Sequence, residues 1–240
     1  ITISDIIQND GVLNNDSIIT NTGTFTNTVK ITNTGTITND GEFTNNNMIT
    51  NDGTFANNGN FTSGGGTQNI IMFKNNNNFI NNGRIQVDGC CANTTADFSS
   101  NGVFENNGII IDDGVFYTSG KFDNHGTITD TRYFFNYGTL TNFADGVTNY
   151  DLQNYELIIN YGNIYGNLQN YKLIINYDTI IGIIANSGTV QNICDHATID
   201  SVPTGNAVDV IRCGGSAGTS LTTIKKVDPI SKSNSNSKKD

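Results

Sequence analysis

Large apolar residues recur along this chain at every sixth position. Before residue 91, successive six-residue units, or hexads, open at Ile1, Ile7, Leu13, Ile19, Phe25, Ile31, Ile37, Phe43, Ile49, Phe55, Phe61, Thr67, Phe73, Phe79 and Ile85. After a seven-residue interruption, the hexads resume at Phe98, Phe104, Ile110, Phe116, Phe122, Ile128, Phe134 and Leu140, and Gly146 adds one residue before Val147. A period held over this many units indicates a repeat architecture.

An even period fits extended strands. In a strand, alternate side chains point to opposite faces, so the apolar residue and the Asn two positions later share one face. In the hexad from Phe25, the side chains of Phe25 and Asn27 therefore point inward, while those of Thr26 and Thr28 point outward. A helix with 3.6 residues per turn would scatter the same positions around its circumference. The pattern predicts short strands with Asn and the apolar residue inside.

The apolar residues also indicate how many strands make one coil. Grouped by three hexads, aromatic residues stay on two sides and aliphatic residues on the third, as expected when like residues stack. The 16-residue repeat LQNYELIINYGNIYGN, which starts at Leu152 and is followed by LQNYKLIINYDTIIGI, agrees, because a shorter third side explains its length. The predicted fold is an all-β, three-sided parallel β-solenoid with about 18 residues per coil and eleven coils, roughly 50 Å long. One buried column is expected to contain Phe55, Phe73, Phe98, Phe116 and Phe134.

The pattern divides the chain into five segments. Residues 1–90 are predicted to form coils one to five, 91–97 (CANTTAD) a corner insertion loop, and 98–199 coils six to eleven. The hexads vanish near residue 200, so 200–230 is expected to be a C-terminal cap and 231–240 a disordered tail. Asn and Gly suit the corners between strands, and stacked inward Asn amides are expected to hydrogen-bond along the axis.

The sequence pattern typified by TNTGTITNDG resembles two groups of proteins. Three hexads per turn, with a small residue two positions before the apolar one, are similar to the hexapeptide-repeat left-handed β-helix. The richness in Asn, Thr and Gly resembles adhesin-like β-solenoids on bacterial, archaeal and giant-virus surfaces. The resemblance covers residues 1–192 and implies a left-handed rod outside the cell. Acyltransferases of the hexapeptide fold mostly have Gly or Ala after the apolar residue, where this chain mostly has Thr.

Charge and cysteine content narrow the possible partners. Residues 1–211 carry 20 acidic and 6 basic side chains, so the body of the protein would repel nucleic acid. No apolar run approaches the roughly 20 residues of a membrane-spanning helix. The four cysteines show no CxxC spacing and are compatible with disulfides in an oxidising compartment. The expected disulfide joins Cys194 to Cys213. Adjacent cysteines rarely bond each other, which makes Cys90 and Cys91 candidates for a bridge to another chain.

Candidate catalytic groups are sparse, and each has a structural interpretation. A polysaccharide lyase or hydrolase needs clustered carboxylates with a basic residue. The nearest such group consists of Asp112, Asp113, Asp130 and Arg132, although DDG is also an ordinary corner sequence. His125 at an outward corner and His196 in the irregular last coil are both expected to belong to the scaffold.

Ice binding is a further possibility that the pattern disfavours. Thr-x-Thr pairs begin at Thr24, Thr36, Thr127 and Thr139. A flat array needs such pairs on one side, and the first two pairs fall on different sides of the predicted coil.

The most informative outward feature is a change at the fourth hexad position. This position is Thr, Asn or Asp in the early coils and becomes aromatic later. The aromatic residues are Tyr137, Tyr155 and Tyr171 on one side, Phe143, Tyr161 and Tyr177 on the next, and Tyr150 on the third. Exposed rings at strand spacing stack on sugars or bury against another chain, or they simply cover corners. We expect the first six to form partner-binding ladders.

These observations predict a structural or adhesive rod rather than an enzyme, with no cofactor and no metal. Its expected place is extracellular, on a cell envelope, appendage or virion surface. Its expected partners are other protein subunits, in a homo-oligomer or fibre, or surface glycans. The alternative is a carbohydrate-active enzyme on the same fold, which a glycan array with a turnover assay would distinguish.

Overall fold

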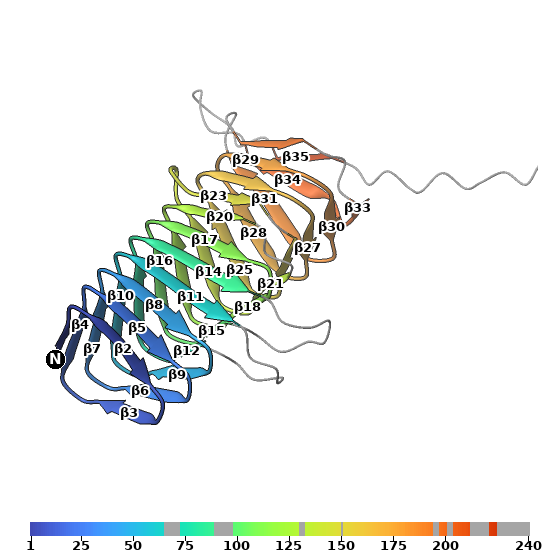
Figure 1. Ribbon diagram of the computed structural model, residues 1–240. Helices are drawn as coiled ribbons and strands as arrows, with labels where there is room; N and C mark the ends of the chain where they lie inside the picture. The colour runs from blue at the N-terminus through green and yellow to red at the C-terminus, as the bar shows by residue number, and fades with distance from the viewer. Residues whose placement is uncertain are drawn as a thin grey trace, which may run out of the picture.

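The computed structural model describes residues 1–64, 73–88, 98–129, 133–149, 151–193, 197–200, 204–211 and 221–224. These residues form strands joined by short turns. They contain no helix, and therefore none long and apolar enough to cross a bilayer. The strands stack in three sheets that wind around a common axis and make a rod (Figure 1). The predicted all-β, three-sided parallel β-solenoid is confirmed.

Sheet A forms the first side of the coils. Its strands are β1 (Thr2–Ile3), β4 (Ile18–Asn21), β7 (Thr36–Asn39), β10 (Thr54–Asn57), β13 (Asn78–Asn81), β16 (Val103–Asn106), β19 (Lys121–Asn124), β22 (Thr139–Asn142), β25 (Leu157–Asn160), β28 (Leu173–Asn176), β31 (Thr189–Ile193), β34 (Val208–Ile211) and β35 (Leu221–Ile224). Neighbours pair in parallel except that β35 pairs antiparallel with β34.

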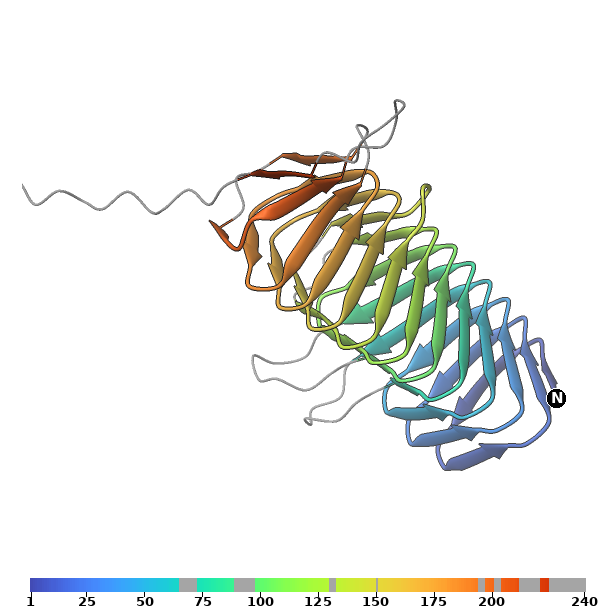
Figure 2. The same cartoon turned by 180° about the vertical axis from the view of Figure 1, so that it is seen from behind.

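Sheets B and C form the other two sides. Sheet B contains β2 (Ile6–Asn9), β5 (Thr24–Asn27), β8 (Glu42–Asn45), β11 (Asn60–Gly64), β14 (Arg84–Asp88), β17 (Ile109–Asp112), β20 (Thr127–Thr129), β23 (Val147–Asn149), β26 (Asn163–Tyr165), β29 (Thr179–Ile181) and β32 (Thr198–Asp200). Sheet C contains β3 (Val12–Asn15), β6 (Lys30–Asn33), β9 (Met48–Asn51), β12 (Phe73–Asn75), β15 (Phe98–Ser100), β18 (Val115–Thr118), β21 (Tyr133–Asn136), β24 (Leu152–Asn154), β27 (Leu168–Asn170), β30 (Ile184–Asn186) and β33 (Thr204–Gly205). About ten turns therefore separate the first and last described strands of these two sheets. Figure 2 shows the same stack from behind.

The pairing of stacked residues records the length of each coil. Ile19 pairs with Ile37, the residue three hexads later, which confirms the predicted coil length. Leu152 pairs with Leu168, the first residue of the next repeat, which confirms the shortened coils. These coils are shortened in the turn between sheets B and C, where Gly166 has a φ of 119°. Only Gly adopts such a backbone readily.

The predicted phenylalanine column was wrong at its first member. Phe55 lies in sheet A and pairs with Ile37 and Phe79, whereas Phe73 lies in sheet C and pairs with Ile49 and Phe98. Residues that pair across the segment between Gly64 and Phe73 are four hexads apart instead of three. That segment therefore adds one hexad to the coil. The hexad assigned to Thr67 does not contribute a described strand. From Phe73 onward, each predicted column belongs to a different sheet than before.

The predicted inward residue Val147 was also wrong, by one position. Ile128 pairs with Thr148, and it is Thr148 whose side chain is fully buried. The coil is longer here because a turn forms at Ala144 and Asp145, closed by a hydrogen bond from the Gly146 N–H to the Phe143 carbonyl.

The phenylalanines fill the core in a regular herringbone. Phe73, Phe98, Phe116 and Phe134 stack face to face along sheet C, with ring centroids 4.7 to 4.8 Å apart. A second stack along sheet A meets the first edge to face, as in the Phe79 and Phe98 pair at 83°. Edge-to-face aromatic pairs stabilise the fold by more than the burial of their apolar area alone. The core is therefore a tightly packed column and not a channel.

Inward asparagines form the predicted ladders. The longest ladder runs along the corner between sheets A and B, where each Nδ2 donates to the Oδ1 of the next Asn at 2.7 or 2.8 Å, through Asn21, Asn39, Asn57, Asn81, Asn106, Asn124, Asn142, Asn160, Asn176 and Asn192. The ladder between sheets C and A is interrupted at Ser100 and Thr118. Buried amides need such partners, because an unpaired polar group in the interior is costly.

The corner between sheets B and C is the irregular one. Its ladder ends at Ser63, and buried Val87 and Asp112 follow at the equivalent position. The breaks after β11 and β14 fall at this corner, and so do the shortened turns of the 16-residue coils. Several changes in coil length therefore fall where no continuous amide ladder has to be preserved. The extra turn at Ala144 and Asp145 differs, because it lies at the corner between sheets A and B, where the ladder continues from Asn142 to Asn160.

Candidate partner-binding surfaces

The first predicted tyrosine ladder stands at the corner after sheet C. The rings of Tyr137, Tyr155 and Tyr171 stack with centroids 4.6 and 4.7 Å apart and planes within 10°. The Tyr155 hydroxyl donates to Gln153 Oε1 at 2.9 Å, and the Tyr171 hydroxyl makes the same bond to Gln169 at 3.0 Å. These bonds hold the rings over the outer face of sheet C.

This ladder continues into aromatic residues that the sequence analysis did not single out. Tyr117 stacks on Phe135 at 4.8 Å, and Tyr117 lies 6.2 Å from Tyr137. The ring centroid of Tyr133 lies 6.1 Å from that of Phe135, on the same strand β21. We call these six residues the sheet C aromatic surface: Tyr117, Tyr133, Phe135, Tyr137, Tyr155 and Tyr171. The sequence signal was the aromatic residue directly after an inward Phe, in VFYT and YFFN.

The surroundings raise the pKa of two tyrosine hydroxyls of this surface. Burial raises the pKa of the Tyr117 hydroxyl, and the neighbouring Tyr137 adds to the rise. Burial is also the largest cause of the raised pKa of Tyr155, followed by the effect of Tyr137 and then Tyr171. Because a raised phenol pKa favours the neutral form, both hydroxyls stay uncharged at neutral pH.

The second predicted ladder stands at the corner after sheet A. Tyr161 and Tyr177 stack at 4.6 Å, and Phe143 lies 6.4 Å from Tyr161. The ladder begins one coil earlier than predicted, because the His125 ring stacks on Phe143 at 3.9 Å. His125 Nδ1 also lies 3.3 Å from Asp145 Oδ1. These contacts place His125 in the ladder, as a packed aromatic member of the scaffold.

The strands between the two ladders carry an apolar outer face. Leu157 and Ile159 point outward from β25, and Leu173 and Ile175 occupy the same positions on β28. Every other sheet A strand from β4 to β31 has at least one polar outward residue, such as Thr139 on β22 or Gln191 on β31. We define the sheet A apolar face as Leu157, Ile159, Tyr161, Leu173, Ile175 and Tyr177. The sequence signal was the loss of alternation in ELIIN and KLIIN.

One ion pair borders this face. Lys172 Nζ lies 2.7 Å from Glu156 Oε2, and both side chains are exposed at the corner where β25 and β28 begin. An exposed pair of this kind contributes at most about 1 kcal/mol to stability. The ion pair matters because Glu156 and Lys172 directly precede Leu157 and Leu173 and therefore lie at the edge of the apolar face.

The stacking decides which parts of the rings are accessible. Neighbouring tyrosine rings cover one another's faces at 4.6 to 4.7 Å. A sugar that stacks on an aromatic residue needs a free ring face. Within these tyrosine stacks only the terminal rings offer one, whereas the ring edges are free to pack against a flat surface.

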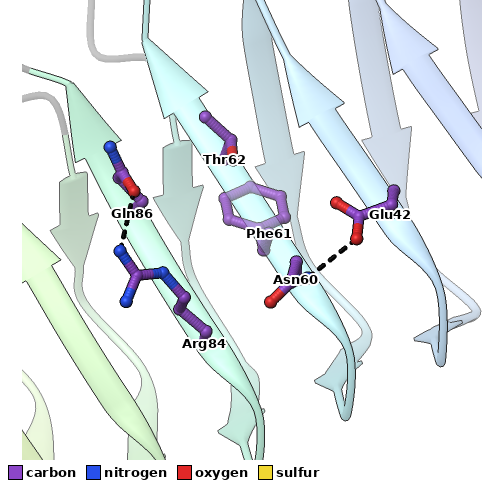
Figure 3. A pocket seen from close by; sticks show the side chains of 6 residues that line it. All are labelled: Glu42, Asn60, Phe61, Thr62, Arg84 and Gln86. Carbon is purple, nitrogen blue, oxygen red and sulfur yellow. Dashed lines mark hydrogen bonds between the residues drawn. The ribbon is translucent and has the colours of Figure 1, made fainter.

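A shallow polar hollow lies on the outer face of sheet B (Figure 3). It encloses about 210 Å³ between Glu42, Asn60, Thr62, Arg84 and Gln86. Asn60 Nδ2 donates to Glu42 Oε1 at 2.7 Å, and Arg84 donates to Gln86 Oε1 at 3.0 Å. The hollow has one carboxylate, whereas glycoside hydrolysis ordinarily uses two.

The candidate catalytic residues are not brought together by the described residues. Asp112 points inward and is fully buried, with its Oδ1 accepting the Gly114 N–H at 2.7 Å, while Asp113 is exposed. Asp130, Arg132 and His196 lie outside the described residues. No group of three or more His, Cys, Asp or Glu side chains that could hold a metal occurs in the part of the chain that the structure describes.

Several predictions from the sequence fall on residues outside the described ranges. These are the disulfide between Cys194 and Cys213, the pair Cys90 and Cys91, Tyr150, the corner loop 91–97, most of the cap 200–230, and the tail 231–240. The Thr-x-Thr pairs are described, and they lie on two sheets. The pairs at Thr24 and Thr127 belong to sheet B and those at Thr36 and Thr139 to sheet A, which confirms that they do not align.

Comparison with known proteins identifies no relative. No protein-family model matches the chain, and neither does any curated protein or solved structure.

Proposed function

We propose that this protein is a structural rod, displayed on a cell or virion surface, that attaches side by side to another protein surface through its C-terminal coils. One observation carries the proposal: two successive coils, β25 and β28, present only apolar outward side chains on sheet A. A solvated solenoid needs polar outward residues, and the neighbouring coils have them. The four aliphatic side chains are half-buried and the two tyrosines are exposed, and a contiguous apolar surface of this kind is typical of an interaction site in soluble proteins.

A protein partner fits the surface better than a glycan does. Each ring in the tyrosine stacks has at least one face covered by a neighbour, which leaves mainly edges and aliphatic side chains to make contact. Such a surface is complementary to the flat, apolar face of another β-sheet. The acidic character of the chain, which has a net charge of −10, further disfavours anionic polymers.

Photo-cross-linking on intact source cells or virions tests this proposal. Benzoylphenylalanine at Tyr177, an exposed member of the apolar face, is expected to form an adduct with another polypeptide on irradiation. The matched control is benzoylphenylalanine at Thr36, an outward position on the same sheet in an early coil, which is expected to form none. Antibody labelling of intact particles should find the rod at their surface.

The opposite results would overturn the proposal. Absence of any adduct from Tyr177 would remove the attachment surface, and an adduct only with polysaccharide would replace the protein partner by a glycan. Rods found only inside intact particles would exclude surface display.

Two double variants test whether the tyrosine rings bind a partner or only cover the corners of the coils. Replacing both Tyr161 and Tyr177 with Thr is expected to weaken attachment by about 2–4 kcal/mol while folding stays nearly intact. Replacing Tyr155 and Tyr171 in the same way removes two hydroxyl bonds to glutamine and tests the sheet C aromatic surface. Loss of folding without selective loss of attachment would show that the rings only cover corners.

A further inference from the structure

The partner of the sheet A apolar face can be specified. We infer that this face binds the same face of a second copy of the chain, with the two rods antiparallel. The inference rests on the proposed function and adds to it the identity and orientation of the partner.

The geometry of the face suits a second copy. Two β-sheets pack face to face about 10 Å apart when their side-chain rows match, with strands within about 30° of each other. The face has two rows, Leu157 with Ile159 and Leu173 with Ile175, at the spacing of paired strands. A two-fold axis along the strand direction places β25 of one copy over β28 of the other. Each aliphatic residue then lies opposite the aliphatic residue at the matching position.

The ion pair at the border selects this orientation. Under the same two-fold axis, Glu156 lies opposite Lys172 of the second copy, and Lys172 lies opposite Glu156. A two-fold axis along the rod would instead place Lys172 opposite the corner of Tyr177 and Asp178, and Glu156 opposite the Tyr161 corner, which offers it no base. Charges arranged in this way fix register and orientation more than affinity. Only antiparallel rods therefore give both Glu156 and Lys172 an opposite charge on the second copy.

The size of the face predicts a weak dimer. Six residues of strand span about 17 Å, and the four strands β22, β25, β28 and β31 span about 19 Å, so the flat area is about 300 Å². A stable interface buries about 800 Å² on each partner. The polar outward residues of β22 and β31 form a rim around the apolar centre. We therefore expect a dissociation constant between about 10 μM and 1 mM.

Salt provides an independent signature. Each chain carries a net charge of −10, so two copies repel at long range. Ionic strength near physiological screens charges beyond about 8 Å. Dimerisation is therefore expected to strengthen as salt rises from about 0.01 to 0.15 M, whereas attachment to a basic partner would weaken.

Sedimentation analysis of the full chain is the test of the face. Wild type is expected to shift from monomer to dimer over the concentration range given above. Ile159→Thr combined with Ile175→Thr should weaken the dimer at least tenfold. The matched control is Ile80→Thr, which makes the same chemical change on β13 of the same sheet, outside the face, and should leave the dimer unchanged. Circular dichroism checks that each variant keeps its β-structure.

Charge exchange tests the orientation. E156K alone and K172E alone are each expected to weaken the homodimer, because like charges then meet across the interface. A mixture of these two variants should form a heterodimer, and the double exchange E156K with K172E should restore the homodimer. Failure of both rescues, with the single variants still weakened, would overturn the antiparallel arrangement.

The remaining outcomes distinguish this inference from the proposed function. A chain that stays monomeric at about 1 mM, or dimers unaffected by the isoleucine variants, would overturn docking of a second copy. An adduct from Tyr177 at twice the chain mass supports it. An adduct with a different protein overturns it while leaving the proposed function intact, and no adduct overturns both.

Discussion

The ring of Phe55 stacks on the ring of Phe79, four hexads later in the chain, with centroids 5.1 Å apart and planes within 4°. The backbones agree, since Ala56 pairs with Ile80 on the outer side of the same two strands. The additional hexad between β11 and β12 therefore shifts every later strand to a new sheet position. This register is open to a chemical test.

Engineered cysteines should report the register directly. Neighbouring strands place Cα atoms about 4.8 Å apart, within the range of about 4.4–6.8 Å that a disulfide spans. Ala56→Cys with Ile80→Cys is expected to form a disulfide on mild oxidation. Ala56→Cys with Lys74→Cys, which an unshifted count of hexads would pair, should not, because these residues lie on different sheets. Peptide mapping by mass spectrometry identifies the linked peptides, and a link only in the second variant would contradict the register.

The asparagine ladder should be a major source of stability. Asn57 Nδ2 donates to Asn81 Oδ1 at 2.8 Å and to two backbone carbonyls, and its own Oδ1 accepts from Asn39. Asn57→Ala removes these bonds and leaves buried polar groups unpaired, at about 1–3 kcal/mol for each group. Urea unfolding followed by circular dichroism should show a loss of about 2–4 kcal/mol.

The neighbouring residue provides the control for that experiment. Asn58 belongs to an outer, exposed ladder, in which its amide donates to Asp40 and accepts from Asn82. Water replaces those bonds, so Asn58→Ala should cost less than about 1 kcal/mol. Equal losses of unfolding free energy for Asn57→Ala and Asn58→Ala would contradict the expectation that burial determines how much the ladder stabilises the fold.

Glycine at the corners should be required where coils approach closely. A Cβ at Gly83 would lie 2.1 Å from the Gly59 carbonyl oxygen in the preceding coil. Because the obstacle is backbone, Gly83→Ala should destabilise the fold by about 1–3 kcal/mol. Gly11 has no atom within 4 Å of the same position, so Gly11→Ala should change stability by less than about 0.5 kcal/mol. Thermal melting of both variants measures the contrast, and similar melting temperatures would contradict it.

Alkaline pH should weaken the fold through the sheet C aromatic surface. The raised pKa values of Tyr117 and Tyr155 mean that the folded chain keeps protons that the unfolded chain releases near pH 10. Their contribution is fully present below that pH and is lost as pH rises toward the folded pKa values. The free energy of unfolding should fall more steeply above pH 10 in wild type than in a Tyr117→Phe, Tyr155→Phe variant. Parallel pH profiles from denaturant titrations would contradict this expectation.

The candidate surfaces were only partly predictable. The ladders at Tyr137 and Tyr161 follow from the hexad position, because that position fixes which side chains point outward. Tyr117 and Phe135 share the same outward geometry, yet they join the ladder only because β18 and β21 stack next to Tyr137. The sheet A apolar face likewise depends on β25 and β28 being neighbours in sheet A.

The sequence by itself determined the parallel coil, the inward Phe and Asn, and the outward Thr and Tyr. These features follow from a strict period of six, and strand alternation is a local property that each hexad specifies alone. Only the tertiary structure decided which hexads stack on which. Hydrogen bonds between coils join residues far apart in sequence, as between the strands of Leu152 and Leu168 or of Phe73 and Phe98. An insertion at a corner changes every later partner without altering any local pattern. For that reason the column of Phe55 and the inward position of Thr148 could be established only from the folded chain.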